Sequence, residues 1–93
     1  MSLIKDRTNQ VFDLDKALNN LKFSKSIKIT VFKEKNGDEY IIEDNTNNLS
    51  FHADEYGSII VFTGTKVLIS IDRGADENKD YYNKIREIVK ELL

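Results

Sequence analysis

Residues 36–65, called the acidic stretch below, constrain this chain most, because they are strand-forming and carry negative charge only. The stretch holds six acidic residues and neither Lys nor Arg. Its apolar residues occur at spacings typical of strands: Tyr40, Ile41, Ile42, Leu49, Phe51, Ile59, Ile60, Val61 and Phe62. Alternation with period two is typical of strands that bury one face. The acidic stretch therefore predicts several short strands at the centre of a small sheet.

A further strand is predicted over residues 26–35, immediately before the acidic stretch. The dipeptide Asn36-Gly37 follows it and favours a two-residue hairpin turn. Pairing outward from this turn sets Phe32 opposite Ile41. The same register gives the sheet one face that holds Phe32 and Ile41 and another that holds Ile29, Val31, Tyr40 and Ile42.

Three more strands are expected over residues 49–54, 59–63 and 66–71, and helices flank the set. Asp13 is a candidate N-cap for a short helix over about residues 13–22. A longer C-terminal helix is predicted to begin near Asp76 or Asn78 and to end near Leu92. The predicted fold class is α+β: a short N-terminal helix, a five-stranded antiparallel meander sheet and a longer C-terminal helix packed on the sheet. Both helices on one face, or one on each face, fit the pattern equally.

The length indicates one domain over residues 1–93, in which residues 1–10 lack a period and are expected to form a flexible, frayed arm or a short edge segment. The absence of Cys excludes disulfides, thiolate zinc sites and Cys nucleophiles. No run approaches the roughly 18–20 apolar residues of a membrane span, and no signal-type segment begins the chain. We therefore expect a cytoplasmic protein that does not engage membranes.

The formal net charge of −2 hides an uneven distribution, because the acidic stretch is preceded by a lysine-rich segment. Lysines recur between residues 22 and 35, and carboxylates of the next strand are expected beside them. Phosphate binding needs uncompensated positive charge. Direct nucleic-acid binding is therefore not expected.

Three patterns of chemical interest are incomplete. The triad residue types Ser50, His52 and Asp54 stand parallel on one predicted strand, whereas a triad needs contacts in series. The side-chain oxygens of Asp44, Thr46, Asn48 and Glu55 have the spacing of a calcium-binding loop, but Leu49 takes the position that needs Gly. Thr63-Gly64-Thr65-Lys66 lacks the paired glycines and the following helix of a phosphate loop. No enzyme activity, catalytic residue, metal site or cofactor is therefore predicted.

The function that we expect is a small interaction protein of the inhibitor, immunity or regulatory type, which docks on the basic surface of a protein partner. In such a surface, exposed apolar residues supply affinity and the acids beside them supply association rate. The candidate partner-binding residues are Phe32, Glu39, Ile41, Glu43, Asp44, Asp54, Glu55 and Tyr56. Three alternatives stay open: acids that only keep the sheet soluble, a small-molecule or enzymatic pocket lined by Tyr81 and Tyr82, and a homodimer through the second apolar sheet face.

Overall fold

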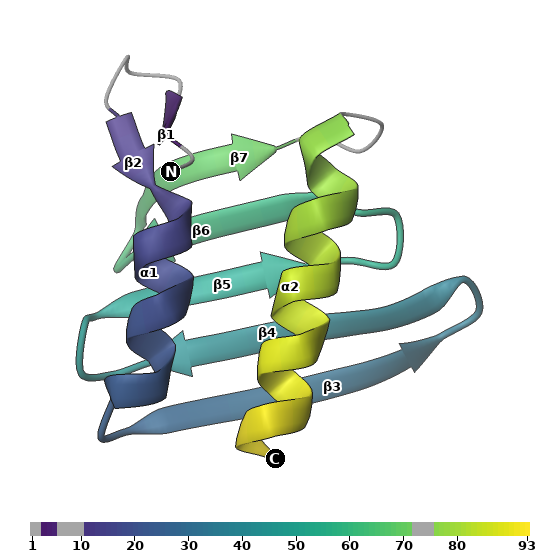
Figure 1. Cartoon of the computed structure of the whole chain (residues 1–93), viewed down its shortest axis with the longest axis horizontal. Coiled ribbons are helices and arrows are strands. Elements are labelled where there is room, and N and C mark those ends of the chain that lie inside the picture. The colour runs from purple at the N-terminus through teal and green to yellow at the C-terminus, as the bar shows by residue number, and fades with distance from the viewer. Residues whose placement is uncertain (1–2, 6–10, 72–75) are drawn as a thin grey trace.

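The computed structural model describes residues 3–5, 11–71 and 76–93 and confirms the α+β fold (Figure 1). Strands β1 (Leu3–Lys5) and β2 (Val11–Asp13) form a small antiparallel sheet, and β1 lies in the segment for which an arm or a short edge segment was expected. Residues 1–2 and 6–10 of the expected arm lie outside the described residues. The helical elements are α1 (Leu14–Asn20), the 3₁₀ helix η1 (Leu21–Phe23) and α2 (Asp76–Leu92). The main sheet contains β3 (Ile27–Glu34), β4 (Gly37–Asp44), β5 (Leu49–Ala53), β6 (Ile59–Thr63) and β7 (Lys66–Ile71).

The main sheet is an antiparallel meander in the order β3-β4-β5-β6-β7, as predicted. The last two strands have the predicted bounds, and β5 ends one residue earlier, because Asp54 already belongs to the following turn. A bulge interrupts the β6–β7 pairing: Val61 pairs with Ile69 and Phe62 with Val67. Leu68 is thus the extra residue of β7.

The predicted register of the β3–β4 hairpin is wrong by two residues. Phe32 pairs with Glu39, and Ile41 pairs with Thr30, so Phe32 and Ile41 are diagonal neighbours. The turn consists of Lys35 and Asn36, and Gly37 already belongs to β4. Because the shift is an even number of residues, every side chain keeps its predicted face.

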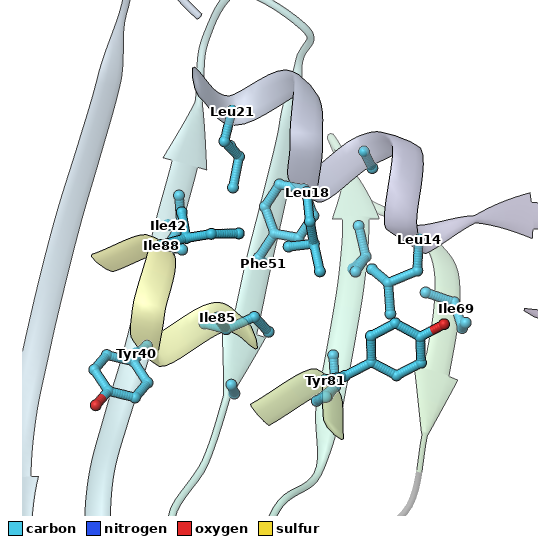
Figure 2. Close-up of a cluster of buried hydrophobic side chains, with 14 of the residues drawn as sticks. Leu14, Leu18, Leu21, Tyr40, Ile42, Phe51, Ile69, Tyr81, Ile85 and Ile88 are labelled. Carbon is cyan, nitrogen blue, oxygen red and sulfur yellow. The ribbon is translucent and has the colours of Figure 1, made fainter. Parts of the chain in front are cut away.

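Both helices lie on the same face of the main sheet and run across its strands (Figure 1). Figure 2 shows the core between these layers, where helix residues meet Ile42, Phe51 and Ile69 of the sheet. From α1 and η1 come Leu14, Leu18 and Leu21, and from α2 come Tyr81, Ile85 and Ile88. The core therefore lies between one layer of helices and one layer of strands. Of the two predicted arrangements, the structure has both helices on one face of the sheet.

The N-terminal helix begins where the sequence predicts. The Asp13 side chain accepts a hydrogen bond of 3.0 Å from the Lys16 amide and so caps α1. An ion pair of 2.7 Å between Lys84 and Asp15 joins α2 to α1. None of the helices in the described part of the chain is long and apolar enough to span a bilayer.

Candidate functional site: the open face of the sheet

The face of the main sheet that α1 and α2 leave uncovered is called the open face (Figure 1). Its central row follows the strand register: Thr30, Ile41, His52, Ile60 and Ser70 lie side by side from β3 to β7. A second row contains Lys28, Glu43, Ser50, Phe62 and Val67. Phe32 and Glu39 begin a third row on β3 and β4.

Apolar and aromatic side chains cross the open face in a diagonal, called the apolar stripe. It consists of Phe32, Ile41, His52, Ile60, Phe62 and Val67. Three of these are large hydrophobic residues with substantial exposure: Phe32 at 44%, Ile60 at 37% and Val67 at 47%. A contiguous apolar area on a small protein is a typical mark of a binding surface.

The single histidine belongs to the apolar stripe. The rings of His52 and Phe62 are in tilted contact, with centroids 5.0 Å apart. Ser50 is on the same face, but the Asp54 carboxylate binds the backbone amides of Tyr56 and Ser58 at 2.9 Å each. The three triad residue types therefore do not form a relay, and His52 contributes an aromatic surface.

Two acids of the acidic stretch lie on the open face. Glu39 and Glu43 stand on β4, two residues on either side of Ile41. Within the part of the chain that the structure describes, neither carboxylate makes a hydrogen bond or an ion pair. Lys28 is opposite Glu43 in the register without a direct ion pair. Among the described residues, both carboxylates are therefore unpaired.

The other four acids of the acidic stretch hold the fold together. Asp44 lies on the helix-covered side and is 1% exposed. Its carboxylate accepts hydrogen bonds from the Ser24 hydroxyl at 2.6 Å and from the Asn47 side chain at 2.8 Å. The backbone amides of Thr46 and Asn47 donate to it as well. Asp44 is thus a buried structural residue, and the open face does not include it.

Asp54, Glu55 and Tyr56 form the turn between β5 and β6. The Glu55 carboxylate accepts a hydrogen bond of 3.0 Å from the Asn36 amide, which ties this turn to the β3–β4 hairpin. Tyr56 is 52% exposed. These residues lie at the end of the sheet, beside the open face and not on the apolar stripe.

Asp38 has partners on the other side of β4. Its carboxylate lies 2.9 Å from the Lys33 ammonium and 3.5 Å from the Tyr40 hydroxyl. The Tyr82 hydroxyl donates to the Asp38 carbonyl, and the rings of Tyr40 and Tyr82 have centroids 5.7 Å apart. Burial raises the pKa of both tyrosines, and the negative charge of Asp38 raises both further.

The tyrosine pair suggested as a pocket lining contributes to the packing between the sheet and α2. Tyr81 is buried in the core and Tyr82 packs on Tyr40. An open polar depression lies elsewhere, between α1 and α2, and is lined by Asp13, Asp15, Lys16, Asn19, Asn20 and Lys84. Within the described residues, no three His, Asp or Glu side chains are placed to hold a metal ion.

Of the eight candidate residues, the structure brings Phe32, Ile41, Glu39 and Glu43 together on one surface. Three surface residues of the apolar stripe, Ile60, Phe62 and Val67, were not among the residues predicted from the sequence. The signal was present, because the run 59–62 is apolar at every position and a single covering layer can bury only alternate residues. Comparisons with protein families, with curated proteins and with solved structures find no match to this chain.

Proposed function

We propose that this protein is a non-enzymatic interaction protein, of the inhibitor, immunity or regulatory type, that binds a protein partner through the open face. The observation that carries the proposal is the placement of both helices on one face of the sheet. The opposite face then exposes a continuous apolar stripe with two unpaired carboxylates beside it. Apolar anchors supply affinity, and charged groups around them supply rate and selectivity.

The charge of the open face favours a partner with basic groups over a second copy of this chain. Glu39 and Glu43 flank the stripe, and Lys28 is the one base in the three rows described above. A second copy would bring its own Glu39 and Glu43 to the same interface, where like charges repel. Phosphate groups would be repelled in the same way, which disfavours nucleic acid.

Site-directed photo-cross-linking tests the proposal. A benzophenone amino acid replaces Val67 on the open face, and a control variant carries it in place of Glu87, an exposed residue of α2. Each variant is illuminated in an extract of the cells that encode the protein. We expect Val67 to yield one protein adduct, which Glu87 does not yield and which a second change, Ile41→Lys, abolishes.

Other outcomes would contradict the proposal. Equal adducts from both positions would indicate non-specific contact, and no adduct from Val67 would leave the open face without a partner. An adduct of twice the mass of the chain would favour the homodimer instead. Far-ultraviolet circular dichroism and urea unfolding show whether Ile41→Lys is folded, and Ile60→Lys replaces it if it is not.

A further inference from the structure

We infer that the part of the partner that occupies the open face is an amphipathic α-helix. The apolar side of this helix lies on the apolar stripe, and Lys or Arg residues line both edges of that apolar side. This inference rests on the proposed function and adds the secondary structure and the charge of the occupant. Two observations carry it: the direction of the apolar stripe and the position of the two unpaired carboxylates.

The apolar stripe has the length of a typical helix. Phe32 is level with Glu39 on β4, whereas Val67 is level with Glu43, so the stripe crosses all five strands diagonally. With strands about 4.8 Å apart and residues about 3.3 Å apart along a strand, the stripe is about 23 Å long. An α-helix of about 15 residues has this length.

A helix also suits a sheet face better than an extended segment does. The side chains of the stripe stand on the face of the sheet, where no backbone N–H or C=O group points outward to pair with a strand. An extended segment would therefore place its own polar backbone against apolar side chains, which is costly. A helix satisfies its backbone hydrogen bonds internally.

The covered face of the same sheet already packs helices across its strands. Both α1 and α2 cross the strands (Figure 1), and α1 with η1 contributes Leu14, Leu18 and Leu21 at helical spacing (Figure 2). The strand direction and pleat of this sheet therefore accept a helix across the strands. The apolar stripe offers a comparable surface on the opposite side.

The carboxylates determine the charge of the helix. Glu39 and Glu43 stand about 7 Å from Ile41 along β4, one on each side of the stripe. A helix that lies along the stripe passes between them. Its two polar flanks then face one carboxylate each, so a basic residue is favoured on both flanks. An acidic helix of the same shape would be repelled.

A synthetic peptide tests this directly. The probe is a 15-residue peptide with blocked ends, with Leu on one helical face and Lys on both flanks, and its binding is followed by fluorescence anisotropy and circular dichroism. One control peptide has the same composition with its leucines spread around the helix, and another has Glu in place of Lys. We expect only the probe to bind, with a gain in helicity. Glu39→Gln with Glu43→Gln should weaken binding about fivefold, and Glu87→Gln on α2 should not change it.

The results separate this inference from the proposed function. The inference would be overturned if either control peptide bound as tightly as the probe, or if the Ile41→Lys variant bound the probe as tightly as the wild type. Binding of the probe without a gain in helicity would overturn it as well. A Val67 adduct with a partner that does not contact the stripe through a helix leaves the proposed function standing and removes the inference. If the probe does not bind at all, the inference falls, and cross-linking then decides the proposed function alone.

Discussion

The hydroxyl of Ser24 donates a hydrogen bond of 2.6 Å to the buried carboxylate of Asp44. This bond joins the segment before β3 to the last residue of β4. The same carboxylate accepts the backbone amides of Thr46 and Asn47 and so orders the loop that leads into β5. One acid of the acidic stretch therefore fixes two connections of the sheet.

Removing this carboxylate should destabilise the protein strongly. Asp44→Ala leaves the Ser24 hydroxyl and the Asn47 groups without their acceptor, and we expect a loss of about 3 kcal/mol in the free energy of unfolding. Glu43→Ala is the matched control, since Glu43 precedes it on β4 but points to the open face; its effect should stay within about 0.5 kcal/mol. Urea unfolding of both variants measures this, and equal losses would contradict the structural role.

The pH dependence of stability should report the same residue. Burial by itself would raise the pKa of Asp44, but hydrogen bonds from Ser24, Asn47 and Thr46 outweigh it and hold the pKa below its ordinary value. Because the folded pKa lies below the unfolded one, the carboxylate stabilises the fold above about pH 4, and this stability is lost as the pH falls through the folded pKa. The difference in urea midpoint between the wild type and Asp44→Asn should therefore shrink as the buffer is taken from about pH 6 to acid pH. A constant difference would exclude this titration.

The bounds of a strand could be predicted from the sequence where its apolar run ends at a turn residue. Residues 59–63 and 66–71 form β6 and β7 with the predicted bounds, because their apolar runs end at the turn around Gly64. The structural role of Asp44 could be predicted only in part. Period-two spacing from Tyr40 and Ile42 puts Asp44 on the inner face, but its partner Ser24 is 20 residues away in sequence.

The hairpin register failed for a different reason. Asn36-Gly37 is a strong local turn signal, yet contacts from outside the hairpin surround the turn. Glu55 accepts the Asn36 amide, and the Tyr82 hydroxyl donates to the Asp38 carbonyl. Neither contact can be read from the hairpin sequence. The open face could not be predicted either, because the amphipathic pattern of a helix does not determine which face of the sheet the helix covers.

Gly37 should resist substitution for two separable reasons. Its φ of 143° is a conformation that residues with a side chain rarely adopt, and an added Cβ would lie 3.3 Å from the Tyr82 hydroxyl. We expect Gly37→Ala to cost about 1–3 kcal/mol in the free energy of unfolding. Gly64→Ala is the control for backbone strain alone, because φ is 58° and no atom lies within 4 Å of the added Cβ. In a Tyr82→Phe background the cost of Gly37→Ala should fall, and an unchanged cost would show that the hydroxyl contributes nothing.

The neighbouring residues Tyr81 and Tyr82 should respond oppositely to loss of their hydroxyl groups. The Tyr81 hydroxyl is buried in the core without a hydrogen-bond partner among the described residues. A buried unsatisfied hydroxyl is costly, so Tyr81→Phe should leave the free energy of unfolding unchanged or raise it by about 1 kcal/mol. The Tyr82 hydroxyl donates to the Asp38 carbonyl, so Tyr82→Phe should lower that free energy by about 1 kcal/mol. Urea unfolding at neutral pH compares the two, and a Tyr81→Phe loss as large as that of Tyr82→Phe would mean that the Tyr81 hydroxyl is bonded.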